Sequence, residues 1–427
     1  MPEESAIRIG DLAAGVRGVS YRPEHLQEDV GPDRTVLLRS TNIQDGQLDF
    51  NSIQIVPSYL VKPAQVVQKG DLVVCMSNGS KALVGKAARY GGEYGAPLTV
   101  GAFCSVFHPK TESDSAFLRH VFQGEQFRRS IDIILSGSAI NNLKNSEVEG
   151  ISIVGHAPTE RAKIADILDA IDDAIIETDA VIEKLRTVHV GLIDDLLSRG
   201  LADDGSPREP STLAETEVGP RPATWTVANL GRFVVGAEYG TNLSLGDSSA
   251  GIPVLRMNNI QDGEFDLSDM KYAPAHAVDR FRLQRNDVLF NRTNSWEHVG
   301  KAAIWRRDEA GPAFASYLVR LHCGDALLPE FLHLWLNWAP VQRAIRQFAT
   351  PGVQQVNINP TNLRRALIAV PDTLDEQQAI IERVNGVAAA IEDHRRERAK
   401  LSSLREGLRD DLLTGRKPVV AIREAAE

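Results

Sequence analysis

The segment IADILDAIDDAIIETDAVIEKL, residues 164–185, carries an apolar residue at almost every third or fourth position. The steps alternate between four and three residues, which is the 3.5-residue period of a helix that buries one seam. An isolated helix would leave this seam in water, so the pattern predicts a helical partner along the whole length. The seam positions are Ile164, Leu168, Ile171, Ile175, Thr178, Ile182, Leu185, His189, Leu192 and Leu196.

The same pattern returns later in the chain, in the segment IIERVNGVAAAIEDHRRERAKL, residues 380–401. Every seam position is shifted by the same 216 residues, the distance from Ile164 to Ile380. A constant shift indicates that one unit has been duplicated, and the second helix is the obvious partner of the first. The second set of positions is Ile380, Val384, Val387, Ile391, His394, Arg398, Leu401, Arg405, Leu408 and Leu412.

Sequence signals at both ends bound the two predicted helices to residues 156–200 and 372–416. Thr373 and Glu376 form a capping-box pattern, and Gly200 and Gly415 suit helix C-termini. About 40 residues at 1.5 Å each give a rod of roughly 60 Å, which is a spacer length. The alternative is that each helix is the core of its own helical bundle, and the constant shift makes that alternative less favourable.

Composition indicates an ordinary globular protein with several domains, because 427 residues exceed one core and 43% of them are hydrophobic. No run of 18 apolar residues exists and Met1–Gly10 lacks an apolar signal region, so we expect a cytoplasmic protein without a membrane partner. The net charge of −10 argues at first against nucleic acid. However, residues 156–218 hold 15 acidic against 6 basic residues, whereas residues 219–371 hold 13 against 16. The total therefore says little about any local binding face.

The remaining sequence forms two similar regions, residues 1–155 and 223–371, separated by a linker at 201–222 and followed by a tail at 417–427. Each region contains short apolar runs divided by turn residues, an Asp-Gly hairpin signal at Asp45 and Asp262, and the string VGKAA at 84–88 or 299–303. We expect an α+β fold with two αβ domains, each followed by a long helix. The two helices would pack as an antiparallel coiled coil, giving an internal pseudo-two-fold repeat.

Catalytic and cofactor motifs are missing from the sequence. The glycine and lysine of VGKAA are followed by alanine and lack phosphate-loop spacing. The ten histidines form no HExxH pair, and neither a GxSxG elbow nor a GxGxxG fingerprint occurs. Asn359 and Pro360 are followed by Thr361, so the Asn-Pro-Pro-aromatic motif of amino-methyltransferases is absent. We therefore expect a chain that is not an enzyme and holds no metal or cofactor.

Several paired motifs resemble the DNA-specificity subunits of type I restriction-modification systems. They are Arg39 with Asn42 and Arg256 with Asn259, the turns at Gly70-Asp71 and Asp287, both VGKAA strings, the helix start at Pro371, Glu376 and Gln377, and the helix end at Leu412–Arg416. The resemblance covers nearly the whole chain. The first helix departs from it, because it opens with Glu160 and Arg161 and ends in LLSRG. These departures touch the helix boundary only.

The resemblance implies a function and a set of partners. Each αβ domain would be a target-recognition domain that reads one half of a bipartite site in double-stranded DNA. The paired helices would hold the half-sites apart, and a rod of roughly 60 Å is ample for a full DNA turn of roughly 34 Å. Two modification (methyltransferase) subunits with S-adenosylmethionine and two ATP-dependent restriction subunits would dock on the chain.

Candidate DNA-binding residues are loop side chains suited to bases or phosphates. They are Arg39, Asn42, Ser77, Asn78, Lys81, Lys86, Asn141 and Asn142 in the first domain, and Arg256, Asn258, Asn259, Arg292, Asn294, Ser295, Lys301, Gln354, Gln355 and Asn357 in the second. Residues that recur in both domains have an alternative role as scaffold, because shared residues cannot explain different half-sites. Lys86 and Lys301 suit phosphate better than bases. The positions at which the domains differ are the better candidates for base reading.

A second function class is a duplicated protein-binding scaffold that recruits partners through its helices without touching DNA. Salt dependence separates the two hypotheses, because DNA affinity should fall with salt at a log-log slope of about −0.9 per phosphate contact. A free-standing enzyme is a distant third.

Overall fold

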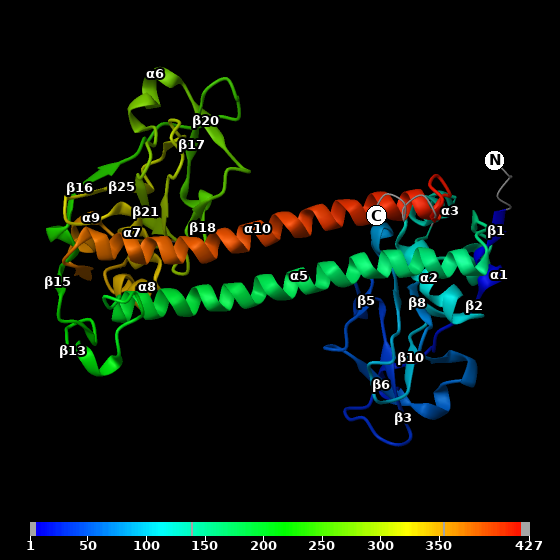
Figure 1. Cartoon of the computed structure of the whole chain (residues 1–427). Helices are drawn as coiled ribbons and strands as arrows, with labels where there is room; N and C mark the ends of the chain where they lie inside the picture. The colour runs from blue at the N-terminus through cyan, green and yellow to red at the C-terminus, as the bar shows by residue number, and fades with distance from the viewer. Residues whose placement is uncertain (1–5, 138–139, 353–354, 420–427) are drawn as a thin grey trace. The chain divides into compact units, whose positions relative to one another are not determined.

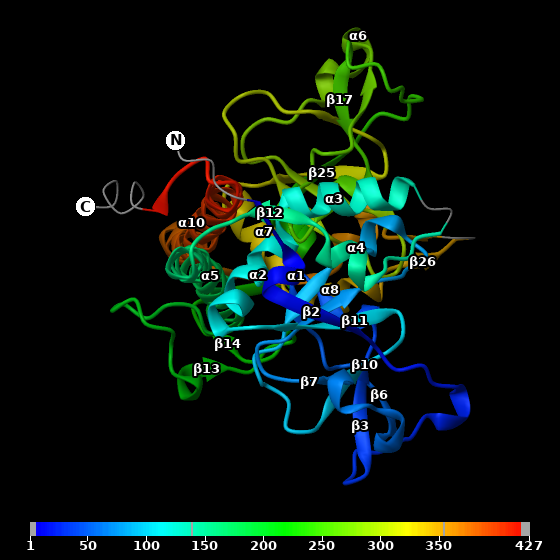
Figure 2. The ribbon, with the colours of Figure 1, turned by 90° about the vertical axis from the view of Figure 1, so that its right-hand side faces the viewer.

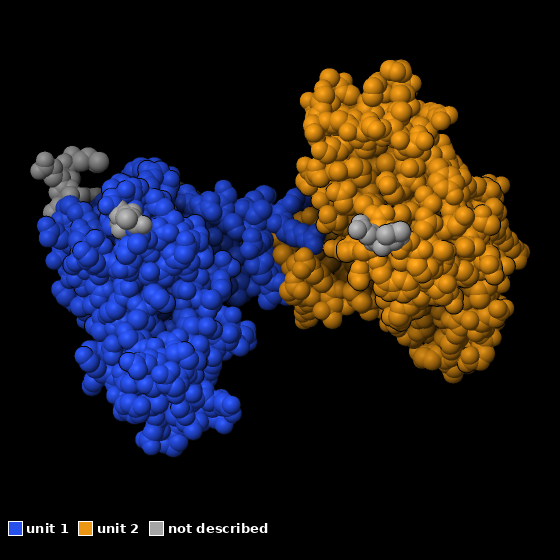
Figure 3. All heavy atoms as spheres, turned by 180° about the vertical axis from the view of Figure 1, so that it is seen from behind, with its two compact units in different colours: residues 1–180, 395–427 blue, residues 181–394 orange. Residues whose placement is uncertain are grey.

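The structure is a computed structural model that describes residues 6–137, 140–352 and 355–419. The chain divides into two compact units, drawn in different colours in Figure 3. Unit 1 contains Met1–Ala180 and Arg395–Glu427, and unit 2 contains Val181–His394. Each unit therefore includes one αβ region together with parts of both long helices.

Unit 1 contains two four-stranded sheets (Figure 1). The first sheet is antiparallel and has the order β2 (Ala13–Arg17), β11 (Cys104–Pro109), β8 (Leu72–Cys75) and β9 (Ala87–Arg89). The second has the order β6 (Gln54–Pro57), β3 (Arg34–Leu38), β10 (Leu98–Val100) and β7 (Val66–Val67), with β3 and β10 parallel. This second sheet lies at the end of unit 1 away from α5 (Pro158–Arg199), as Figures 1 and 2 show.

Both faces of the first sheet are buried, which explains the continuous apolar run Leu72–Cys75. Leu72 and Val74 face a core shared with α2 (Glu112–Gln123) and α3 (Glu125–Ser136). Val73 and Cys75 point to the opposite face, as the strand period of two requires, and pack in the core between the sheets. The remaining elements of the unit are β1 (Ala6–Arg8) paired with β12 (Ser152–Val154), the hairpin of β4 (Ile43–Gln44) and β5 (Gln47–Leu48), α1 (Ile9–Leu12) and α4 (Asn145–Glu149).

Unit 2 repeats this order of elements. Its four-stranded sheet has the order β16 (Val234–Tyr239), β25 (Leu318–Cys323), β21 (Val288–Asn291) and β23 (Ala302–Ile304), and its second sheet has the order β20 (Lys271–Ala273), β17 (Ile252–Leu255) and β24 (Ala313–Phe314). The parallel pair β17–β24 corresponds to β3–β10. The helices are α6 (Ala275–Val278), α7 (Pro329–Asn337), α8 (Ala339–Arg346) and α9 (Pro360–Leu363).

The smaller strands of unit 2 complete the αβ region. They are β13 (Leu213–Ala214) with β14 (Arg221–Pro222), β15 (Trp225–Asn229) with β28 (Leu367–Pro371), β18 (Ile260–Gln261) with β19 (Glu264–Phe265), and β22 (Thr293–Asn294) with β27 (Val356–Asn357) and β26 (Thr350–Pro351). The hairpins predicted from the Asp-Gly pairs are confirmed. Asp45 and Gly46 have φ of 47° and 78°, and Asp262 and Gly263 have φ of 49° and 82°, as a type I′ turn requires.

The two long helices are α5 (Pro158–Arg199) and α10 (Leu374–Leu413). Within unit 1, Ile164 and Leu168 of α5 share one buried core with Leu412 of α10. Within unit 2, Leu196 and Leu197 of α5 share a core with residues of α10 such as Ile380. The heptad seams therefore enter the cores of the αβ regions at these points. Among the described residues, none of the helices combines the length and the apolar character that a membrane crossing needs.

Candidate nucleic-acid interface

The Arg-x-x-Asn motif forms the same local structure in both units. In unit 1, Asn42 is 1% exposed and its Oδ1 accepts a hydrogen bond from the backbone N–H of Arg39 at 2.8 Å. The Asn42 amide nitrogen donates to the carbonyls of Asp49 and Ser52 at 2.8 and 3.0 Å. These bonds close the loop that carries the hairpin.

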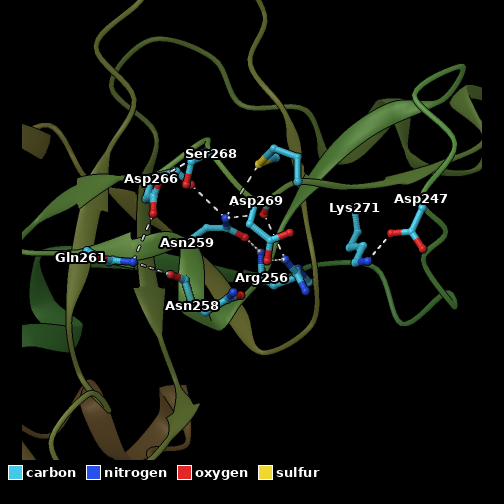
Figure 4. Close-up of polar contacts among 10 residues, drawn as sticks. Asp247, Arg256, Asn258, Asn259, Gln261, Asp266, Ser268, Asp269 and Lys271 are labelled. Atoms are coloured by element: carbon cyan, nitrogen blue, oxygen red, sulfur yellow. Dashed lines mark hydrogen bonds and ion pairs between the residues drawn. The ribbon is translucent and has the colours of Figure 1, made fainter. Parts of the chain in front are cut away.

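The second copy of the motif makes the corresponding hydrogen bonds, which are drawn in Figure 4. Asn259 accepts from the N–H of Arg256 at 2.8 Å and donates to the carbonyls of Asp266 and Asp269 at 2.8 and 3.0 Å. A buried amide with its hydrogen bonds inside the protein favours the scaffold alternative for Asn42 and Asn259. The neighbouring Asn258 is exposed and stays a candidate for DNA contact.

The arginines of the motif differ in their partners. Arg256 pairs with the carboxylate of Asp269 at 2.7 Å, whereas the corresponding contact of Arg39 is with Ser52, whose carbonyl lies 3.4 Å from Nη2. The buried Nε atom of each arginine has no hydrogen-bond partner among the described residues. Arg256 is therefore neutralised within the protein, and Arg39 keeps more of its positive field for a phosphate.

The lysines of the two VGKAA strings lie against the hairpins of their own units. Lys86 donates to the carbonyl of Ile43 at 2.7 Å, and the Nζ of Lys301 lies 4.0 Å from the carboxylate of Asp262. Both side chains are half-buried. The lysines share this place next to the hairpin in both units, which fits a recurring phosphate or scaffold role better than base reading.

Unit 1 brings together two segments that are distant in the sequence, with Gly79 and Asn141 separated by 62 positions. Ser77 pairs with Asn142 in an isolated bridge, and the N–H of Asn78 donates to the carbonyl of Asn141 at 3.3 Å. The side chain of Asn141 donates to the carbonyl of Gly79 at 3.2 Å. Four predicted residues thus form one polar surface at the end of β8. Lys81 lies beside it, exposed, with its Nζ 3.2 Å from the Ser136 hydroxyl.

Arg17, at the end of β2, holds this surface in place. It was not among the residues predicted from the sequence. Its guanidinium donates to the carbonyl of Ala102 at 2.6 Å, to the carbonyl of Leu143 at 2.9 Å and to Oδ1 of Asn142 at 2.9 Å. The last bond fixes the orientation of the Asn142 amide. Burial lowers the pKa of Arg17, but an arginine remains charged at neutral pH in any case. The residues that it joins lie 85 to 126 positions away, so local sequence gives no signal for the role.

Unit 2 assembles its surface at the end of β21. The strand segment β22 pairs with β27, and the amide of Asn357 donates to the hydroxyl of Thr293 at 2.7 Å. Asn294 donates to the carbonyl of Met257 at 3.4 Å, and Gln355 lies 3.7 Å from the Met257 sulfur. Ser295 begins the next turn, where its hydroxyl is 2.9 Å from Nδ1 of His298. Gln354 lies outside the described residues.

The arginine of unit 2 comes from a different place in the sheet, directly after the end of β21. Arg292 follows β21 and donates to the carbonyl of Ser316 at 3.2 Å, and Ser316 occupies the turn position that Ala102 has in unit 1. Its guanidinium also lies 5.2 Å from the ring of Tyr239 at the end of β16. The position on β16 that corresponds to Arg17 is thus a tyrosine, and the position that corresponds to Arg292 is Met76. These contacts favour a positioning role for Arg292, which the sequence placed among the DNA-binding candidates.

The described residues also include buried thiols and one cluster of His and Asp side chains. Burial raises the pKa of Cys104 to about 12 and also that of Cys323 to about 12, so both thiols stay protonated at neutral pH. His120, Asp169 and Asp172 are close enough to hold a metal ion. Arg119, however, already pairs with Asp169 at 2.9 Å and with Asp172 at 3.0 Å. The cluster is therefore an ion-pair network that ties α2 to α5 within unit 1.

Comparison with known proteins finds relatives of one kind, specificity subunits of type I restriction enzymes. No family model matches the chain. The specificity subunit of the type I restriction enzyme EcoKI from Escherichia coli (strain K12) is 26% identical over 385 residues, which cover 89% of this chain and 81% of that protein. The StySPI specificity subunit from Salmonella potsdam is 24% identical over the same shares.

Solved structures show the same fold. A chain from a type I restriction-modification system, described for its assembly and conformational transition, aligns with a TM-score of 0.59 at 15% identity and covers 97% of this chain and 99% of its own. The type I S subunit from M. genitalium aligns with a TM-score of 0.54 at 12% identity and covers 96% of both chains.

The structure consists of two αβ regions and two long helices. The relatives identify the class more closely. The chain is similar, over 89% of its length, to specificity subunits of type I restriction enzymes, whose modification and restriction activities are carried by other subunits. The resemblance to these subunits that the paired sequence motifs indicated is confirmed.

Proposed function

We propose that this chain gives a type I restriction-modification complex its DNA sequence specificity, with each αβ domain reading one half of a bipartite site. The observation that carries the proposal is the repeated scaffold with unequal loops. Asn42 and Asn259 make the same hydrogen bonds in the two units, whereas the polar surfaces beside them differ in sequence and in the position of the arginine. Shared backbone with different side chains suits two different half-sites.

The two long helices would pair antiparallel as the spacer between the half-sites. Two ion pairs within unit 1 support this arrangement. Asp172 of α5 lies 3.3 Å from Arg405 of α10, and Asp179 lies 3.0 Å from Arg398. One heptad forward on α5 thus corresponds to one heptad backward on α10, which is the register of antiparallel helices. The domain boundaries predicted from the sequence, and the pseudo-two-fold repeat, belong to this proposal.

The partners follow from the family. We expect double-stranded DNA, two modification subunits that carry S-adenosylmethionine, and two restriction subunits that use ATP, in the cytoplasm. The relatives are single specificity subunits of restriction enzymes, so the number of each partner subunit in the complex is part of the proposal.

The adenine methylome of the host, with and without this gene, tests the function directly. We expect methylation to disappear at one bipartite motif when the gene is removed. Exchange of residues 1–155 for those of a relative should then change one half-site only, and insertion of one helical turn into both long helices should change the spacer. An unchanged motif after both edits would contradict the proposal and favour the protein-binding scaffold.

A further inference from the structure

Each unit contains a tight turn that presents an aromatic side chain beside the polar surface. In unit 1 the turn is Gly101–Cys104, closed by a 2.8 Å hydrogen bond from the N–H of Cys104 to the carbonyl of Gly101. In unit 2 the corresponding turn is Ala315–Leu318, closed by the same bond at 2.9 Å. The third residue of each turn is aromatic. Phe103 is 69% exposed and Tyr317 is 46% exposed.

The backbone of each turn is fastened to the residues that form the candidate interface. The carbonyl of Phe103 accepts hydrogen bonds from the N–H groups of Met76 and Ser77 at 2.8 and 3.0 Å. The carbonyl of Tyr317 accepts from the N–H of Arg292 at 3.1 Å. The aromatic residues are therefore continuous with the polar surfaces.

An arginine holds the preceding residue of each turn. Arg17 donates to the carbonyl of Ala102, and Arg292 donates to the carbonyl of Ser316. In both units an arginine donates to the carbonyl of the second turn residue, although the arginine stands at a different position in each. This indicates that a fixed backbone position of the turn is required in both domains.

A single exposed aromatic residue is ordinary on a protein surface and needs no explanation. Here an aromatic residue stands at the same turn position in both copies, while most of the polar residues around it differ. A ring on a fixed backbone loses little conformational entropy when it binds, because only its two side-chain torsions remain to be ordered. The turn is thus suited to contact another molecule.

We propose that Phe103 and Tyr317 contact the DNA half-site read by their own domain, through apolar contact with base edges such as a thymine methyl group. The inference rests on the proposed function and extends it to residues that carry no charge. DNA is the occupant because the aromatic residue and the polar surface share direct hydrogen bonds, so a molecule bound to one lies against the other. Apolar contacts of this kind distinguish bases without any phosphate contact.

The test uses the complete complex of this chain with its modification subunits and a duplex that carries the bipartite site. Phe103→Ala should weaken binding about 5- to 50-fold, the range expected for losing one base contact. The slope of affinity against salt should stay unchanged, since no phosphate contact is lost. Tyr59→Ala is the matched control, because Tyr59 is an 80% exposed aromatic residue of the same unit in the short helical turn Ser58–Leu60. It should bind like the wild type.

Tyr317 provides an independent test in the other half-site. Tyr317→Ala should weaken binding by a similar factor, and Tyr317→Phe should keep most of the affinity if the ring makes the contact. Substitution of the half-site bases should become less costly in the half-site of the truncated aromatic residue only. This loss of discrimination is an effect that a loss of folding would not produce.

The outcomes separate the inference from the function on which it rests. If the wild-type complex prefers no bipartite site, the proposed function fails. If the wild type is specific but both alanine variants bind within twofold of it, the aromatic contact is wrong. If instead a variant loses its modification subunits while the assembled remainder binds DNA normally, the turns contact protein and the inference is overturned.

Discussion

The two αβ units share the hydrogen bonds of a buried asparagine loop and differ in the side chains that hold the candidate interface. The buried asparagines Asn42 and Asn259 make bonds of the same length to the same backbone atoms of their units. At the ends of β8 and β21, in contrast, the arginine that holds the loops stands at a different position in each unit. The two units therefore keep the same backbone geometry in this loop, while different side chains hold the neighbouring loops in place.

The largest loss of stability should come from removing the buried asparagine that both units share. Asn259→Ala removes three hydrogen bonds of a buried amide and leaves backbone groups without partners, so unit 2 should lose about 3–4 kcal/mol in free energy of unfolding. All five tryptophans lie between Trp225 and Trp338, so their fluorescence reports the unfolding of unit 2. Asn258→Ala, at an exposed neighbour, is the control. Asn42→Ala should lower the free energy of unfolding of unit 1 by a similar amount. A clearly unequal loss would show that the two asparagines are not structurally equivalent.

A second prediction uses pH to separate the two hairpin turns. His333 donates from Nε2 to the carbonyl of Gly263 at 2.8 Å, and its buried Nδ1 has no hydrogen-bond partner among the described residues. Burial lowers the pKa of His333 to about 4, so the unfolded chain takes up a proton from about pH 6.5 downward and the folded unit does not. The contribution to stability is full above pH 6.5 and is lost as the pH falls to about 4.

The expected loss is about 2–3 kcal/mol between pH 7 and pH 4.5, measured by tryptophan fluorescence during denaturation. His333→Gln keeps a donor and removes the titration, so its stability should change less over this range. The side chain beside Gly46 in unit 1 is Gln123, which does not titrate, and that turn should show no such dependence. A His333→Gln variant as sensitive to pH as the wild type would refute the assignment.

A smaller loss of stability is expected when the arginine contacts of unit 1 are removed. Arg17→Met removes bonds to Ala102, Leu143 and Asn142 and should cost about 1–2 kcal/mol, together with weaker binding to the first half-site. The double variant Arg17→Tyr with Met76→Arg copies the arrangement of Tyr239 and Arg292. It should recover most of the DNA affinity, measured by titration of the assembled complex.

Met76→Arg alone is the control for that exchange, because Met76 is fully buried and Arg17 still occupies the loop carbonyls. It should be less stable than the double variant. If the double variant is worse than both single variants, the two arginines are not equivalent.

The sequence predicts those features that depend on local pattern. The heptad seams locate α5 and α10, the Asp-Gly pairs locate the hairpins, and the shared strings reveal two similar regions. Four of the candidate residues, Ser77, Asn78, Asn141 and Asn142, come together in unit 1, and their contact with DNA stays a prediction.

The remaining features depend on contacts between distant residues. Arg17 lies in a short strand without any motif, and its role arises only when β2 and β11 pair next to the loop at Asn142. Arg292 lies in a polar loop, so the sequence alone favours a base-reading role. Its guanidinium donates to the carbonyl of Ser316, a contact that the sequence does not reveal. The burial of Asn42 likewise follows from the closed loop and not from its neighbours in the sequence.

The division of the chain has a consequence for its synthesis. Unit 1 begins with the first residues of the chain, but its core also contains Leu412, packed with Ile164 and Leu168. Because chains fold from the N-terminus as they emerge from the ribosome, unit 2 has all its residues before unit 1 does. Unit 1 can close its core only after α10 has been translated. A product that stops at His394 would hold one complete unit and one open hydrophobic surface, because the part of α10 that completes the core of unit 1 would be missing.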